Sequence, residues 1–135
     1  MSSLAPSLYP SALVALGGAV GALGRFQLGR AVTHALGPNT AFPWATLSAN
    51  IIGSLAMGLL VGWLAHRGAA GSDDLRLLLG VGLLGGFTTF SAFSLEMILL
   101  VERGDVGLAM AYAALSIAAG LAALYLGLIA MRGAA

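Results

Sequence analysis

Four long apolar stretches, separated by short polar breaks, set the pattern of this sequence. They run over residues of about 10–34, 42–65, 75–101 and 106–131. Each is long enough for the roughly 20 residues that an α-helix needs to cross a hydrocarbon core of about 30 Å. The breaks carry turn-forming residues: GPNTAFP after the first stretch, HRGAAGSDD after the second and ERGD after the third. The pattern predicts an all-α integral membrane protein, with four transmembrane helices in one domain over residues 1–135.

The composition narrows the class of function. The chain is 59% hydrophobic and only 8% charged, so it is not a soluble domain with a polar surface. It has no cysteine and a formal net charge of only +1, which gives no thiol chemistry and no reason to expect nucleic-acid binding. No combination of nucleophile, base and metal ligands is visible, and we therefore expect no enzyme activity.

The basic residues do not favour one orientation in the membrane. With four spans, Arg67, Arg76 and Arg132 fall on one side, whereas Arg30 and Arg103 fall on the other, together with Arg25 if it is counted from within the first span. This balance leaves two interpretations open under the positive-inside rule. Either a weak bias is hidden by the small number of charges, or both orientations are made and two copies pair antiparallel.

The third apolar stretch places polar groups at its centre. The segment LLGGFTTFSAFSLE covers residues 83–96, and Thr88 is the midpoint of the predicted span. Adjacent glycines weaken a helix, and threonine and serine hydroxyls compete for its backbone groups. Two structures remain open. The helix is intact and uses its glycines for close packing, or it is broken and presents carbonyl oxygens to a cation.

Other side chains in the spans are candidates for an ion pathway. Phe90 and Phe93 are three residues apart, and the positive edges of such rings can contact an anion. Asn50 lies inside the second span, where interhelical bonding and a pore role are equally open. Tyr112 and Ser116 are four residues apart and form a short polar track in the fourth span.

Two charges lie inside the spans. Arg25 is too deep for a loop residue, so it either snorkels, pairs with a carboxylate or gives an aqueous vestibule a positive potential. Glu96 either pairs structurally with an arginine, which we favour, or relays protons. Small residues also recur four apart, which predicts close helix packing, at Gly17 and Gly21, Gly58 and Gly62, and Gly82 and Gly86.

Three segments together resemble the Fluc (CrcB) family of fluoride channels. They are GGAVGALGR in the first span, ATLSANIIGSLAMG in the second and GGFTTFSAFSLE in the third. The resemblance implies a passive, electrogenic fluoride channel in the plasma (inner) membrane of a prokaryote, conferring fluoride resistance. It also implies an antiparallel, dual-topology homodimer in lipid, with two pores, a third helix broken at its centre, and a structural sodium ion at the dimer interface.

The resemblance assigns roles to individual residues. It implies that the backbone carbonyls of Gly85 and Thr88 hold the sodium ion and that Arg25 lies in the vestibule. The fluoride pathway would be formed by side chains of the second, third and fourth spans: Asn50, Thr89, Phe90, Ser91, Phe93, Tyr112 and Ser116. The chain departs from the family pattern at Ala45, Ala92 and Gly120, where glycine, threonine and serine are common.

A second function remains open beside the channel. Small multidrug transporters are also four-helix, dual-topology dimers, and a proton-coupled exporter of this kind would need a titrating carboxylate. Glu96 is the candidate, although it lies near the end of its span. A noncatalytic assembly subunit would be served by the glycine faces alone, but it would leave the hydroxyl and phenylalanine cluster unexplained.

Overall fold

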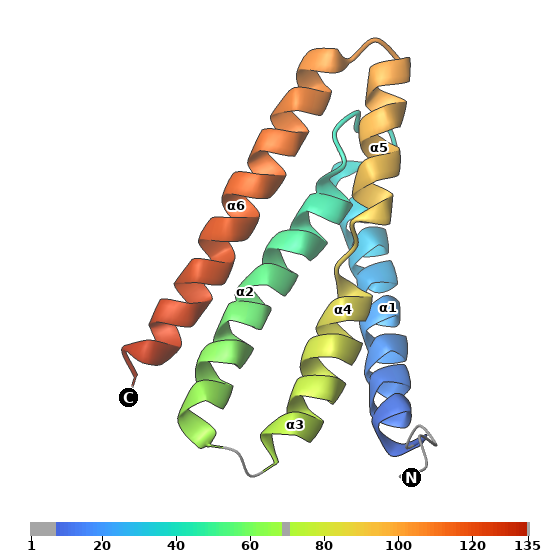
Figure 1. The fold of residues 1–135 in the computed structure, drawn as a ribbon. Coiled ribbons are helices and arrows are strands. Elements are labelled where there is room, and N and C mark those ends of the chain that lie inside the picture. The colour runs from blue at the N-terminus through green and yellow to red at the C-terminus, as the bar shows by residue number, and fades with distance from the viewer. Residues whose placement is uncertain (1–7, 69–70, 135) are drawn as a thin grey trace, which may run out of the picture.

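The computed structural model describes residues 8–68 and 71–134, and these residues form helices joined by short turns, without strands (Figure 1). The helices in chain order are α1 (Leu8–Leu36), α2 (Trp44–Arg67), α3 (Ser72–Leu75), the π-helical segment η1 (Arg76–Leu84), α4 (Gly85–Phe87), α5 (Ser91–Glu102) and α6 (Val106–Arg132). Together they make four apolar spans long enough to cross a membrane, the third covering residues 72–102. The all-helical, four-span prediction is confirmed, and the observed bounds differ from the predicted ones by three residues at most.

The spans alternate in direction. The start of α1, the end of α2, the start of α3 and the end of α6 lie at one end of the molecule, and the α1–α2 and α5–α6 connections lie at the other end (Figure 1). Arg67 and Arg132 are the last residues of α2 and α6, whereas Arg103 directly follows α5. The fold therefore keeps the arginines divided between the two ends as the sequence predicts.

Glycines bring the helices into close contact in two pairs. α2 packs along α6, and α1 packs along η1 and α4. A methyl group at Gly58 would collide with the carbonyl of Leu124 on α6, and one at Gly17 would collide with the carbonyl of Leu78 on η1. The predicted close packing is confirmed, because an added carbon would come within 3.0 Å of a neighbouring helix at each of Gly17, Gly21, Gly58, Gly62, Gly82 and Gly86.

The third span is not helical along its whole length. α4 ends at Phe87, Thr88 is extended with φ −83° and ψ 160°, and α5 begins at Ser91. The Thr88 backbone N–H and its hydroxyl both donate to the carbonyl of Leu84, at 3.0 and 2.8 Å. The threonine thus closes the last turn of α4 with its own side chain, and the chain can leave the helix at this residue.

Much of the apolar surface faces outward. Tyr112 and Leu100 are the largest fully buried side chains, whereas Leu16, Val20 and Leu121 are more than half exposed. In water such a surface would be costly, since each square ångström of exposed apolar area costs about 25 cal/mol. The distribution suits a chain whose outer face is covered by lipid or by another copy.

Candidate functional site

Asn50 of α2 bonds directly to the interruption in the third span. Its side-chain N–H donates to the Thr89 carbonyl at 3.0 Å, and its Oδ1 accepts the Thr89 backbone N–H at 2.8 Å. Leaving two such groups unpaired would cost about 1–3 kcal/mol each. The amide therefore satisfies both backbone groups of a residue that has left its helix. Of the two roles left open by the sequence, interhelical bonding is the one that these contacts show.

The interruption frees two carbonyl oxygens. In a continuous α-helix the carbonyl of residue i accepts the N–H of residue i+4. The Thr89 N–H, which would serve Gly85, donates to Asn50 instead. The Ala92 N–H, which would serve Thr88, donates to the Thr89 hydroxyl at 3.2 Å. The Gly85 and Thr88 carbonyls, predicted to be cation ligands, have thus both lost their ordinary helical donors.

A polar groove lies beside the interruption, with a volume of about 420 Å³. It is lined by residues from α2, the third span and α6: Asn50, Ser54, Gly85, Thr88, Thr89, Phe90, Phe93, Ser116, Ile117 and Gly120. None of these side chains is ionisable. The groove therefore combines hydroxyls, one amide, backbone and aromatic rings in the middle of an apolar chain.

The two phenylalanines of the groove differ in their surroundings. Phe90 is 79% exposed, whereas Phe93 packs partly buried against the core. Their ring centroids are 5.8 Å apart at 36°. Phe93 also lies 5.0 Å from the ring of Tyr112. Phe93 therefore separates the open groove from the interior of the protein.

One hydroxyl of the groove has no protein partner. The Oγ of Ser116 is buried and makes no hydrogen bond in the part of the chain that the structure describes. By contrast, the hydroxyls of Thr88 and Thr89 are bonded to Leu84 and Ser91. Because a buried hydroxyl normally finds a partner, Ser116 is suited to donate to a ligand in the groove.

Tyr112 and Ser91, predicted for the same pathway, do not line the groove. Tyr112 is fully buried, and its hydroxyl donates to Glu96 Oε2 at 2.7 Å. Glu96 Oε1 accepts the hydroxyl of Thr46 at 2.6 Å. The favoured prediction, that Glu96 pairs with an arginine, is wrong because hydroxyls from α2 and α6 donate hydrogen bonds to both of its carboxyl oxygens. We refer to Thr46, Glu96 and Tyr112 as the carboxylate cluster.

Glu96 of the carboxylate cluster lines a second, smaller cavity. This outer cleft has a volume of about 200 Å³ and lies near the α1–α2 turn. Its lining residues are Thr40, Ala41, Phe42, Pro43, Glu96, Leu99, Leu100 and Arg103. Phe93 and Tyr112 thus lie between the polar groove on one side and a cleft that reaches the end of the molecule on the other.

The sequence analysis missed Thr46 and Ser54. Both are spaced four residues from Asn50 along α2, so all three share one face of the helix. That spacing was a usable signal for a polar stripe. The sequence does not set this stripe apart, because threonine and serine inside a helix commonly bond back to their own backbone. The role of Thr46 is revealed by its bond to Glu96, and that of Ser54 by its place in the groove lining.

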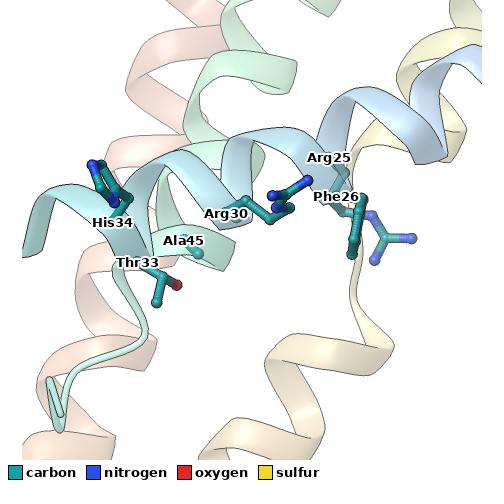
Figure 2. Close-up of a pocket in the computed structure, with 7 residues that line it drawn as sticks. Arg25, Phe26, Arg30, Thr33, His34 and Ala45 are labelled. Carbon is teal, nitrogen blue, oxygen red and sulfur yellow. The ribbon is translucent and has the colours of Figure 1, made fainter. Parts of the chain in front are cut away.

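Arg25 lies in a different cavity from the groove. This basic pocket has a volume of about 600 Å³, and it is lined by Arg25, Phe26, Gly29, Arg30, Thr33, His34 and Ala45 (Figure 2). The Nε of Arg25 is buried and has no hydrogen-bond partner within the described residues. The basic pocket and the polar groove share no lining residue.

Comparison with known proteins gives one consistent result. The model of the family described as "CrcB-like protein, Camphor Resistance (CrcB)" matches residues 12–128. A protein of Novosphingobium aromaticivorans is 59% identical over 93% of this chain and 98% of its own length. Proteins of Phenylobacterium zucineum and Erythrobacter litoralis are 54% and 51% identical, over 89% and 98% of this chain and 93% and 98% of their own lengths. All three carry the name fluoride-specific ion channel FluC.

Proposed function

The chain belongs to the CrcB-like protein family, and we propose that it is a fluoride-selective channel through which fluoride passively leaves the cell. The four apolar spans make it a multi-pass membrane protein, and its relatives are bacterial ion channels by name. The expectation of a transport protein in place of an enzyme is therefore confirmed. A channel in the plasma membrane would relieve fluoride toxicity without a source of energy.

The absence of ionisable side chains from the lining of the polar groove is the observation that best supports this function. Fluoride is small and strongly hydrated, so a pore must replace its water with closely placed donors. A formal positive charge in the middle of a membrane is expensive and would also hold the ion too tightly to release it. Neutral donors are supplied instead by the hydroxyl of Ser116 and the second N–H of Asn50, neither of which has a partner among the residues that the structure describes.

The phenylalanines complete the coordination in this proposal. Aromatic ring edges carry positive partial charge, and Phe90 and Phe93 line the groove with 5.8 Å between their centroids. Thr89 lies in the same lining, and its hydroxyl is paired with that of Ser91 at 3.3 Å. A larger, weakly hydrated halide would gain less from such a narrow set of contacts.

The proposed path continues behind Phe93. The Tyr112 ring lies 5.0 Å from Phe93, and beyond it Glu96 of the carboxylate cluster lines the outer cleft. A path from the groove to this cleft would have to pass Phe93 and Tyr112. In this proposal Tyr112 and Ser116 form successive parts of one polar track, one inside the protein and the other in the groove.

We further propose that two copies pair antiparallel and that each contributes a pathway. The divided arginines agree with insertion in both orientations. Gly85 and Phe90 are exposed at the surface of the single chain although they lie deep in the span, so a second copy would cover them. Arg25 would act as the vestibule arginine across this interface, since its own chain places it outside the groove.

The residues present fit a structural sodium ion. Sodium prefers oxygen ligands, and the Gly85 and Thr88 carbonyls have lost their helical donors to Asn50 and Thr89. Two carbonyls from each of two copies would provide four oxygens at the dimer axis. The bound cation would supply positive charge at the interruption. Asn50 would hold the two carbonyls in place by fixing Thr89.

The proton-coupled exporter has one observation in its favour. Glu96 lines the outer cleft, so a proton could reach its carboxyl group from the end of the molecule. However, both carboxyl oxygens already accept hydroxyl hydrogen bonds, and the residue does not line the groove. We therefore keep this function as the alternative that the experiment must exclude.

Fluoride efflux from liposomes containing the purified protein tests the proposal. The liposomes hold potassium fluoride, with and without a potassium ionophore, and without a pH gradient. We expect rapid efflux only when the ionophore dissipates the charge, and no comparable flux when chloride replaces fluoride. Proton coupling would instead give efflux that follows an imposed pH gradient and needs no ionophore. Retention of fluoride by a folded dimer under all conditions would rule out the channel.

A further inference from the structure

The polar groove contains a second hydroxyl without a protein partner, that of Ser54 on α2. Ser54 is half-buried and lines the groove, and its Oγ makes no hydrogen bond to any residue that the structure describes. Other hydroxyls of the chain bond back to the carbonyl one turn earlier, as helical serines and threonines commonly do. Thr88 donates to Leu84 at 2.8 Å, and Ser94 donates to Phe90 at 2.9 Å. The hydroxyl of Ser54 is instead free to donate to a ligand in the groove.

This hydroxyl faces a position on α6 that has no side chain. The nearest atom of another helix to a Cβ built at Gly120 is the Oγ of Ser54, at 3.7 Å. Gly120 lines the same groove, but a glycine offers no side-chain donor. At this level of the groove the hydroxyl therefore comes from α2 alone.

Ser54 lies at the end of the groove that is farther from the outer cleft. It follows Asn50 by one helical turn, about 6 Å along α2, and Gly120 follows Ser116 by one turn on α6. The two helices pack along each other and run in the same direction (Figure 1). Tyr112 is one turn before Ser116 and so lies on the opposite side, toward the outer cleft. Ser54 thus extends the row of neutral donors away from that cleft.

We propose that Ser54 is a further fluoride-binding residue, whose hydroxyl supplies from α2 the donor that α6 lacks at Gly120. This inference rests on the fluoride pathway proposed above. One helical turn advances about 5.4 Å, which is longer than a hydrogen bond of about 3 Å. An ion that leaves Asn50 and Ser116 in this direction would therefore lose its side-chain donors unless the next turn provided one. Ser54 provides it without a formal charge, which would be expensive at this depth.

Ionophore-dependent fluoride efflux from liposomes tests this role with Ser54→Ala. The change removes a donor but no hydrogen bond within the described protein, so the thermal midpoint of the purified protein should not fall. We expect the flux to fall about five-fold, as for the loss of one ordinary hydrogen bond. Ser48→Ala is the matched control, because Ser48 is also a half-buried serine of α2 but does not line the groove. Wild-type flux in Ser54→Ala would overturn the proposal.

A combined variant separates donation to fluoride from helix packing. Ser54→Ala together with Gly120→Ser moves the hydroxyl from α2 to the facing position on α6, where a Cβ has room. If the hydroxyl serves the ion, the flux should return to within about two-fold of the wild type, since the two positions are coupled through one site. Ser54→Ala with Gly120→Ala fills the same space without a donor and should stay slow. A Gly120→Ser combination that is equally slow would assign the loss to packing and overturn the proposal.

The wild-type protein in the same assay keeps the role of Ser54 distinct from the channel function. Absence of fluoride efflux in the wild type would refute the channel and this role together. Efflux in the wild type with an equal rate in Ser54→Ala would refute only the role of Ser54. A loss in Ser54→Ala that Gly120→Ser restores would support both.

Discussion

The polar groove and the basic pocket offer an anion two different kinds of positive potential. The groove lies beside Thr88, near the middle of the third span, and contains no ionisable side chain. The basic pocket lies along the second half of α1 and contains two arginines and a histidine. Both surfaces carry hydrogen-bond donors and aromatic rings. They differ in whether the positive potential comes from formal charge or from neutral dipoles.

Depth in the membrane explains this difference. A formal charge at the centre of a bilayer costs about 2.5–3.5 kcal/mol or more, whereas near the headgroups a long side chain reaches water and anionic lipid. A small ion that must leave as readily as it enters is better served by several weak contacts. The groove therefore suits transit, and the basic pocket suits the attraction of anions from water.

Removing the aromatic rings from the groove should reduce the fluoride flux more than any other change. We expect Phe90→Ile and Phe93→Ile each to reduce fluoride flux to background, because an aliphatic side chain lacks the positive ring edge. Ionophore-dependent efflux from liposomes is the measurement, and gel filtration checks that the dimer still assembles. Tyr125→Ile, an exposed aromatic of α6 outside the groove, should keep its flux. Wild-type flux in both phenylalanine variants would remove these rings from the path.

Breaking the amide contact should have the next largest effect. In Asn50→Ser the shorter side chain cannot pair with both backbone groups of Thr89, so two polar groups lose their partners at about 1–3 kcal/mol each. We expect both the flux and the thermal midpoint to fall, the flux by roughly ten-fold or more. Gln27→Ser removes an exposed amide of α1 and serves as the control. A lower midpoint with unchanged flux would assign Asn50 to helix packing alone.

The sequence predicted the spans because four apolar stretches of membrane length have few alternative structures. It also identified the glycines that bring α1 to η1 and α2 to α6, since small residues four apart have a simple steric role. Near Thr88 the local sequence was compatible with both an intact helix and a broken one. The choice depends on Asn50, which is 39 residues away from Thr89 along the chain.

The site could be predicted less completely for the same reason. Tyr112 and Ser116 lie on one helix face four residues apart, and the sequence alone cannot tell that one is bonded to Glu96 while the other opens into the groove. The partner of Glu96 was predicted wrongly because charge complementarity suggested an arginine. The actual partners are hydroxyls from two other helices. Hydroxyls are uncharged, so charge complementarity could not point to them.

Removing the free hydroxyl of the groove should give a smaller loss. Ser116→Ala deletes a donor that has no partner in the described part of the protein, so the fold should not weaken. If the hydroxyl donates to fluoride in transit, its loss costs about 1 kcal/mol, or about five-fold in flux. Ser11→Ala, in the exposed first turn of α1, is the control. An unchanged flux with a raised thermal midpoint would show that the buried hydroxyl only destabilises the fold and takes no part in conduction.

Adding a hydroxyl to the groove should have the smallest effect, and it should be in the opposite direction. Gly120 lies one helical turn after Ser116 and lines the groove. A Cβ built there comes no closer than 3.7 Å to the hydroxyl of Ser54, so a serine side chain fits without displacing a neighbour. Gly120→Ser extends the row of donors by one hydrogen bond at the low end of its range, about 0.5 kcal/mol, which corresponds to about a two-fold rise in flux. Gly120→Ala fills the same space without a donor, and it should leave the flux at or below the wild-type rate. Equal effects of serine and alanine would mean that the groove at residue 120 is limited by its width and not by its hydrogen-bond donors.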